Sequence, residues 1–172
     1  GWDNATVFDK GFPTAGADLQ AFLILQMDML TKMAEMLGKN KAAKRWKKRA
    51  DALLDLMIEK LWDGDQFHCK KAFDYDYVRE GDCLLNHMPI VLGKRLPKPY
   101  RERIAEILEP GGRFMTEYGL ATENPESPLY VESGYWRGPI WGPEVVLITD
   151  GLWNAGYKDL AIAYRLAAAH AR

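Results

Sequence analysis

The chain has few of the features that mark membrane, nucleic-acid-binding or disulfide-rich proteins. Its two cysteines, Cys69 and Cys83, form no CxxC pair and are too few for a disulfide framework or a zinc site. No apolar run approaches the roughly 20 residues that a membrane-spanning helix needs. The 23 Lys and Arg residues nearly balance the 24 Asp and Glu residues. No excess of positive charge therefore favours nucleic acid or an anionic membrane as the partner.

The amino end also lacks an initiator methionine and a stretch of signal-peptide character. We expect either a piece of a longer polypeptide or a processed one. The missing signal slightly favours the cytoplasm, but the two cysteines fit a bridge or free thiols, so the compartment stays undecided. With 172 residues and 48% apolar residues, the chain suits one domain over 1–172 and is too short for a second.

The first half of the chain predicts two long helices of different character. Residues 17–37 contain neither Gly nor Pro and are apolar on most sides, which predicts a helix buried against more than one neighbour. Residues 41–62 are apolar on one face only, with Lys and Arg opposite. The basic run KRWKKR therefore reads as a solvated helix face rather than a nucleic-acid patch.

The second half repeats this alternation of buried and amphipathic segments. Further helices are predicted at 83–92, 99–108, 143–155 and 158–171, with a short extended piece at 66–73. Pro89 must lie in the first turns of its helix or kink it. Alternating inner and outer helices are typical of an α/α toroid. We therefore predict an all-α fold, a partial toroid with long aromatic-rich loops and no fixed repeat of the solenoid kind.

The loop over 111–143 is the most informative segment, because loops longer than about 12–15 residues in a compact domain are often functional. It is rich in Gly, Pro and aromatic residues. Flat aromatic faces suit the C–H faces of sugar rings, and the fork of donors on Arg137 suits hydroxyl or carboxylate oxygens. Packing of the loop onto the helices explains the aromatics equally well.

Four blocks resemble one family of glycosidases: GWDNATVFD, DLQAFLILQ, EYGLATENPESPLY and GYWRGPIWGP. They look like the catalytic region of inverting α-glycosidases with an (α/α)6 barrel, the processing α-glucosidase I and mannosylglycerate hydrolase group, and more distantly trehalase. GYWRGPIW is the most specific block. DLQAFL departs from the family's Asp-Leu-Asn-Ala helix start by a glutamine. The resemblance covers nearly the whole chain.

The resemblance implies roles for particular residues. Asp3 matches the general acid, which protonates the glycosidic oxygen and requires a pKa raised by apolar surroundings. Trp2 would supply such a neighbour. Asn4 would orient a hydroxyl or the acid. Asp18 reads equally well as a helix N-cap or a sugar contact. The remaining sugar-holding wall is expected to comprise Tyr135, Trp136, Arg137 and Trp141.

An inverting enzyme also needs a second carboxylate, which activates water. In the family this base lies beyond the Trp-Arg-Gly block, in a later helix pair. Six or seven helices are visible where a closed toroid needs about twelve, so we expect a partial barrel with its base outside this chain. Five glutamates lie in the second half without a base motif: Glu117, Glu123, Glu126, Glu132 and Glu144.

No cofactor is expected, because His68, His87 and His170 lack ligand spacing. The segment FDYDYVREGD contains Asp74, Asp76 and Asp82, but its glycine is misplaced for an EF-hand. A solvated acidic turn is favoured over a calcium site, which remains an alternative.

The expected partner is an oligosaccharide or small glycoside, with neither nucleic acid nor membrane. The main alternative is a non-catalytic carbohydrate-binding or helical scaffold fragment. A sugar epimerase is a further alternative, but it would need catalytic histidines beside other functional residues, and the three histidines lack such neighbours. Exposed inner helices would require either further parent-chain segments or self-association to complete the barrel.

Overall fold

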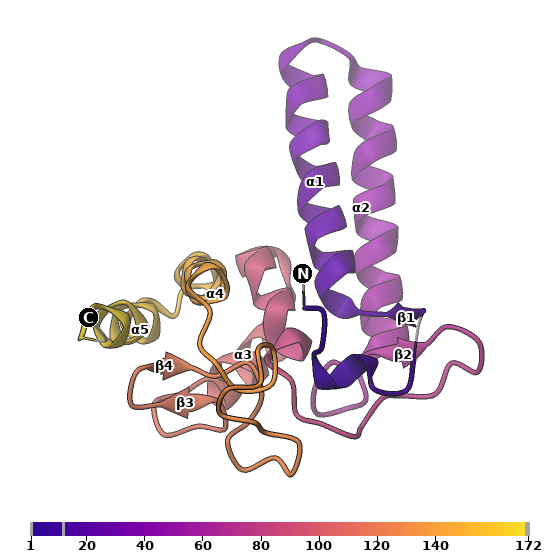
Figure 1. Ribbon diagram of the computed structural model, residues 1–172. Coiled ribbons are helices and arrows are strands. Elements are labelled where there is room, and N and C mark those ends of the chain that lie inside the picture. The colour runs from indigo at the N-terminus through magenta and orange to yellow at the C-terminus, as the bar shows by residue number, and fades with distance from the viewer. Residues whose placement is uncertain (1, 12, 171–172) are drawn as a thin grey trace.

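A computed structural model gives the structure of residues 2–11 and 13–170. Six helical elements form three pairs (Figure 1), in which α1 packs on α2, η2 on α3, and α4 on α5. The six are α1 (Ala17–Met36), α2 (Asn40–Leu61), η2 (Leu84–Arg95), α3 (Lys98–Ile107), α4 (Gly142–Ala155) and α5 (Lys158–His170). The predicted helices are confirmed to within a few residues. Gly1 and the predicted helix end at Ala171 lie outside the described residues.

The first members of the pairs also pack on one another. α1 contacts η2, and η2 contacts α4, so these three elements form the inner layer and α2, α3 and α5 the outer one. This arrangement confirms the mostly helical, partial-toroid fold. None of the helices in the described residues is long and apolar enough to cross a membrane.

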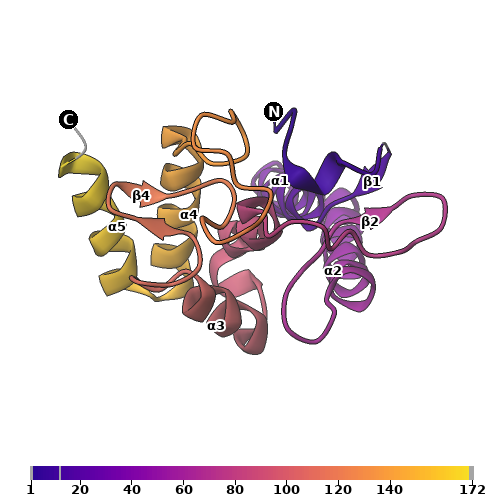
Figure 2. The ribbon, with the colours of Figure 1, turned by 60° about the horizontal axis from the view of Figure 1, so that its bottom comes forward.

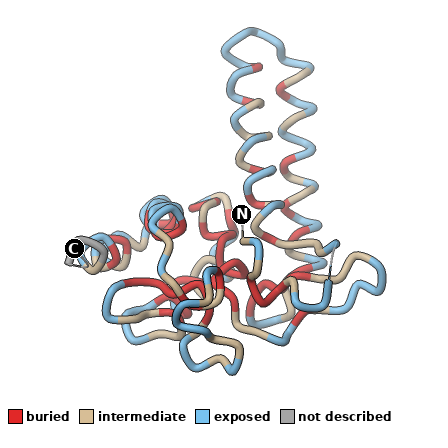
Figure 3. Tube along the Cα trace, in the orientation of Figure 1, coloured by how far each residue is buried: buried red, intermediate tan, exposed pale blue. Residues whose placement is uncertain are grey.

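The α1–α2 hairpin projects from the body of the molecule (Figure 1). Small side chains such as Ala21 and Ala50 are buried at its interface, which lets the two helices approach closely. The opposite face of α1 is exposed: Leu19 is 60% exposed and Met33 55%. Figure 3 shows this mixture of buried and exposed residues along the hairpin. The prediction that this helix packs against more than one neighbour is confirmed, because α1 contacts both α2 and η2, although part of its apolar surface is exposed in the described residues.

The element η2 is the most buried part of the chain. It is a 3₁₀ helix with Pro89 inside it and a break at Gly93, where φ is +56°, and its residues 84–90 are all buried. Proline lacks the N–H that a regular α-helix uses, so the tighter winding accommodates it. A Cβ on Gly151 of α4 would lie 2.6 Å from the carbonyl oxygen of Ile90. The contact between α4 and η2 thus depends on a glycine.

Short strands interrupt the helical fold. β1 (Thr14–Ala15) pairs antiparallel with β2 (Lys70–Lys71), and β3 (Met115–Thr116) with β4 (Gly119–Leu120). The first pair confirms the extended piece expected over 66–73. The second pair forms a hairpin inside the loop that the sequence predicted to be irregular. Figure 2 shows β4 beside α5, which it contacts.

Candidate functional site

The site begins with a turn at the amino end. The backbone N–H of Ala5 donates to the carbonyl of Trp2 over 3.0 Å, which places Asp3 and Asn4 at the centre of the turn. Asp3 is exposed. The Trp2 ring packs on the Trp136 ring.

Asn4 joins this turn to the loop before α4. Its carboxamide oxygen accepts a hydrogen bond from the backbone N–H of Trp136, and its nitrogen donates to the carbonyl of Gly134, each over 2.9 Å. Both polar atoms of the side chain are therefore engaged with backbone. In this position Asn4 aligns the two segments of the site.

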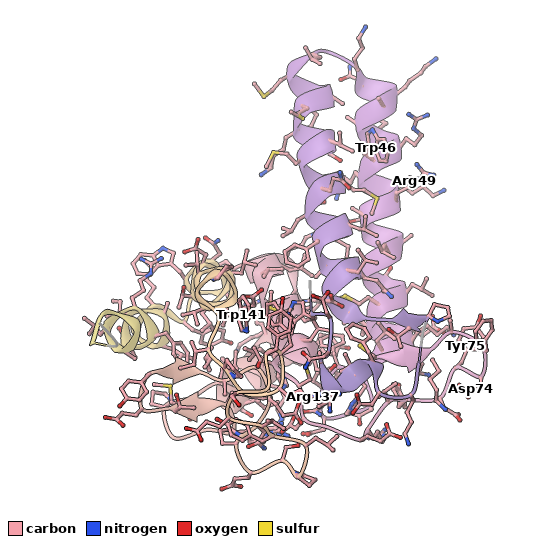
Figure 4. The ribbon with its side chains drawn as sticks, in the orientation of Figure 1. Trp46, Arg49, Asp74, Tyr75, Arg137 and Trp141 are labelled. Carbon is pink, nitrogen blue, oxygen red and sulfur yellow. The ribbon has the colours of Figure 1, made fainter. Side chains whose placement is uncertain are left out.

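Arg137 reinforces the same junction. Its Nε donates to the carbonyl of Asn4 over 2.8 Å, and its two terminal nitrogens donate to the carboxylate of Asp9. Bidentate pairs of this kind are among the strongest hydrogen bonds in proteins. Arg137 is labelled beside the amino-terminal ribbon in Figure 4. All three guanidinium nitrogens bond within the protein, whereas the sequence suggested contacts to a ligand.

Three tryptophans form a continuous stack on this junction. The rings of Trp2 and Trp136 lie 4.7 Å apart, and those of Trp136 and Trp141 lie 4.3 Å apart with an interplanar angle of 14°. Trp136 is buried between the other two, which are only partly buried. The stack joins residues more than 130 positions apart in the sequence, and its outer rings remain available to a ligand.

Tyr135 stands edge-on to this stack, with its ring 5.7 Å from that of Trp136 and 5.1 Å from that of Trp141. Its backbone φ is +64°, a conformation that favours glycine and strains other residues. The indole N–H of Trp141 donates to the Tyr135 carbonyl over 3.0 Å and supports this geometry. Strain of this type often accompanies functional sites.

The buried carboxylate of Glu123 is hydrogen-bonded to the segment that follows Asn4. Glu123 is fully buried and accepts hydrogen bonds from the Thr6 hydroxyl (2.7 Å), the Ser127 hydroxyl (2.6 Å) and the backbone N–H of Asp82 (2.8 Å). A general base must reach water, so these contacts make Glu123 a structural anchor. The sequence offered no signal for this contact, because Thr6 and Glu123 are 117 residues apart.

The other glutamates differ in their exposure. Glu117, Glu126 and Glu132 are exposed. Glu144, in the first turn of α4, is buried, and its Oε2 has no hydrogen-bond partner among the described residues. Burial raises the pKa of Glu144 above its usual value. None of these side chains is joined to the Trp stack by a hydrogen bond in the described structure.

Asp18 lies in the first turn of α1. The N-cap of this helix is Gly16, so the N-cap interpretation of Asp18 is wrong. A Cβ on Gly16 would lie 2.3 Å from an Asp18 carboxylate oxygen, which shows that the side chain folds back over Gly16. Burial raises the pKa of Asp18. Burial, together with the Asp18 charge, raises the pKa of the nearby Cys69 to about 12.

The acidic segment has partners of its own, whereas neither ring nitrogen of His87 has a hydrogen-bond partner in the described structure. Asp74 accepts from Lys71 over 3.0 Å, and Asp82 accepts from Asn124 over 3.0 Å. No group of three or more His, Cys, Asp or Glu side chains with metal-site geometry occurs among the residues that the structure describes. His87 is fully buried against Phe114.

The family comparison matches the whole chain. Residues 1–172 match the family described as the mannosylglycerate hydrolase MGH1-like glycoside hydrolase domain. Two relatives from Selaginella moellendorffii, mannosylglycerate hydrolases MGH1 and MGH2, are each 31% identical over 62 residues. The matched stretch covers 35% of this chain and 13% of each relative.

Solved structures show the same fold. A GH63 mannosylglycerate hydrolase from Thermus thermophilus, in complex with glucose, aligns with a TM-score of 0.75 at 21% identity, covering 92% of this chain and 37% of that one. A second solved structure with the same description, in complex with Tris and D-glycerate, aligns with a TM-score of 0.75 at 20% identity, covering 91% of this chain and 37% of that one. A sialidase aligns with a TM-score of 0.78 at 18% identity, covering 91% of this chain and 16% of that one. This chain thus spans well under half the length of each.

Proposed function

Because the chain belongs to the mannosylglycerate hydrolase MGH1-like glycoside hydrolase family, we propose that it takes part in hydrolysing an α-linked glycosidic bond with inversion of configuration. Asp3 is the general acid in this proposal. The junction of the Asp3 turn with the Trp loop, held by Asn4 and Arg137, is the observation that carries it. It joins the Asp3 turn to the tryptophan loop, although the two lie far apart in the sequence.

The proposed reaction begins with proton transfer from the Asp3 carboxyl to the bridging oxygen of the glycoside. The sugar that loses this bond develops positive charge at its anomeric carbon, and a water attacks from the opposite face. A second carboxylate, about 6.5–9.5 Å from the acid in inverting enzymes, takes a proton from that water. We assign no residue of this chain to that role.

The proposed sugar wall consists of Trp2, Trp141 and Tyr135, which are each partly exposed. Trp136 supports the wall from inside the stack. Asn4 and Arg137 act as positioning residues, because their polar atoms are engaged in the junction. Asp18 is retained as a proposed sugar contact, since its half-buried side chain lies in the first turn of α1.

The substrate class proposed is a small α-linked gluco- or manno-configured glycoside. The glucose and D-glycerate held by the similar solved structures support a small glycoside. The direct test is turnover of methyl α-glucoside and methyl α-mannoside, whose poor leaving groups need protonation, by the protein and by its Asp3→Asn variant. NMR of the first-formed anomer then reports inversion or retention.

A non-catalytic carbohydrate-binding function is the second candidate, and the exposure of Asp3 favours it. Titration calorimetry with oligosaccharides distinguishes the two functions, because a binding fragment gives a heat of binding but produces no free sugar. The exposed apolar face of α1 also supports further packing, by other helices or by a second copy. Light scattering that shows only monomer would contradict self-association.

A further inference from the structure

The far end of the α1–α2 hairpin, which projects from the body of the molecule (Figure 1), concentrates positive charge. Residues 39–49 contain seven Lys and Arg residues and no Asp or Glu. All 24 Asp and Glu residues lie elsewhere, against 23 Lys and Arg residues in the whole chain. The even charge balance of the whole chain therefore hides a basic end on an otherwise acidic molecule.

These cations are almost entirely without carboxylate partners. All seven are exposed. Within the described structure Lys47 pairs with Asp51 over 3.3 Å, and the other six lie in no ion pair. Arg45 and Arg49 lie against the ring of Trp46 instead, 5.6 and 5.3 Å from its centre. Figure 4 shows Trp46 and Arg49 on the projecting part of the hairpin, well separated from the site at Arg137 and Trp141.

The spacing of the cations is unfavourable for the helix that carries them. Three pairs of like charges stand four residues apart on α2: Lys41 with Arg45, Lys44 with Lys48, and Arg45 with Arg49. Side chains at this spacing are neighbours on the helix surface, so like charges there destabilise the helix. A partner with negative charge would compensate for this repulsion.

Two apolar side chains lie at the turn beside these cations. Met36 is 88% exposed and Leu37 is 73% exposed. The turn that follows them is fixed, because Gly38 has a φ of +65° and the backbone N–H of Lys39 donates to the carbonyl of Ala34 over 2.8 Å. The hairpin therefore holds Met36 and Leu37 at its end, next to its first lysines.

Apolar side chains flanked by cations suit the surface of an anionic membrane, where the apolar groups enter the boundary between headgroups and acyl chains and the cations meet lipid phosphates. Glu35 is the one acidic residue between positions 29 and 50, so it offsets little of this charge. Arg45 lies about 8 Å along α2 from the first residue of the helix, within about one Debye length at physiological salt. Nucleic acid would satisfy the cations but offers no apolar phase to Met36 and Leu37.

We propose that the end of the α1–α2 hairpin docks on an anionic lipid bilayer, with Met36 and Leu37 inserted at the level of the headgroups and the Lys and Arg residues of 39–49 facing lipid phosphates. Docking uses no residue of the tryptophan stack. The proposal is therefore independent of the proposed glycosidase function.

The test is sedimentation of the protein with vesicles of phosphatidylcholine alone and of an equimolar mixture of phosphatidylcholine and phosphatidylserine. We expect binding to the mixed vesicles only, and weaker binding as the salt concentration rises. The double variant Lys41→Gln, Lys44→Gln should bind at least about tenfold more weakly, because each cation near an anionic surface contributes about fivefold. Met36→Ser with Leu37→Ser should weaken binding about tenfold, because it removes the apolar groups that insert. Both variants should keep the melting temperature, since all four side chains are exposed.

Two matched control variants carry the same types of change outside this end. Leu19→Ser with Leu56→Ser removes two exposed apolar side chains from the opposite end of the hairpin. Lys60→Gln with Lys98→Gln removes two exposed positive charges from other parts of the surface. Both controls should bind the mixed vesicles as the wild type does.

Three results with vesicles would each overturn the proposal: no binding by the wild type, equal binding to both kinds of vesicle, or wild-type binding by the variants of the hairpin end. Duplex DNA is titrated in parallel. If DNA bound more tightly than the mixed vesicles, and Met36→Ser with Leu37→Ser had no effect on either, the partner would be nucleic acid and the proposal would be wrong.

Discussion

The Asn4 side chain and the Trp136 backbone are joined across 132 residues of sequence, by a hydrogen bond of 2.9 Å from the Trp136 N–H to the Asn4 carboxamide oxygen. The same carboxamide donates to Gly134. Through these two bonds one short side chain fixes the position of the Asp3 turn relative to the tryptophan stack. The proposed function depends on this alignment.

Asn4→Ala should therefore destabilise the fold. It leaves the N–H of Trp136 and the carbonyl of Gly134 without their partners, which costs about 1–3 kcal/mol in the free energy of unfolding. Urea denaturation measures this change. Asn4→Asp keeps the acceptor and loses the donor, so its stability should lie between that of the wild type and that of Asn4→Ala. An Asn4→Ala protein as stable as the wild type would show that the junction contributes nothing.

Trp141→Ala should weaken sugar binding at the proposed wall by about tenfold, because it removes an accessible ring of the stack. Trp153→Ala is the matched control, since Trp153 is also exposed on α4 but contacts Lys158 and Arg165 instead. Calorimetry with the glycoside provides the measurement. Equal losses in both variants would contradict a specific role for the stack.

Gly151→Ala should destabilise the packing of α4 on η2. Alanine normally stabilises a helix relative to glycine, but here the added Cβ would lie 2.6 Å from the Ile90 carbonyl oxygen. We expect a loss of about 1–3 kcal/mol in the free energy of unfolding. Gly142 lies in the same helix with no atom near its Cβ position, so Gly142→Ala should be neutral or mildly stabilising in the same urea titration. Similar stabilities for the two variants would contradict the close contact.

His87 should make stability depend on pH below neutrality. Burial, followed by the charge of Arg113, lowers the pKa of His87 to about 3, so the folded state keeps the imidazole neutral while the unfolded state takes up a proton below about pH 6.5. Stability is therefore full above pH 6.5 and is lost as the pH falls toward 3. At pH 5 the contribution is a loss of about 2 kcal/mol relative to pH 7.

His87→Leu should flatten this dependence. Urea titrations of both proteins at pH 7 and pH 5 measure the difference, and the wild type should lose more stability between the two values than the variant. Identical losses would show that the His87 imidazole does not titrate with folding.

The helices could be predicted from the sequence because their signals are local. The apolar pattern of α2 and the Gly-Pro boundaries of α4 lie within each segment, and both helices occur where expected. The exposure of Met33 could not be predicted in this way, because an apolar helix face does not reveal whether a neighbour covers it. The 3₁₀ winding around Pro89 was not predicted, because a proline in the sequence does not show whether a helix kinks or winds more tightly.

The chemistry of the site was partly visible in the sequence. The Trp-Arg-Gly block indicated an aromatic site, and the stack of Trp2, Trp136 and Trp141 lies there. The contacts of Arg137 with Asp9 and of Glu123 with Thr6 could not be predicted, because each joins segments more than 110 residues apart. Residue type alone cannot distinguish a guanidinium that holds a ligand from one that holds the protein together.

Turnover by the Asp3→Asn variant tests the central claim most directly. The general-acid role predicts that hydrolysis of an α-glycoside with a poor leaving group falls by about 10²–10⁴-fold, while sugar affinity and the melting temperature stay unchanged, because Asp3 is exposed. Hydrolysis at the wild-type rate by a correctly folded Asp3→Asn protein would contradict the proposed mechanism.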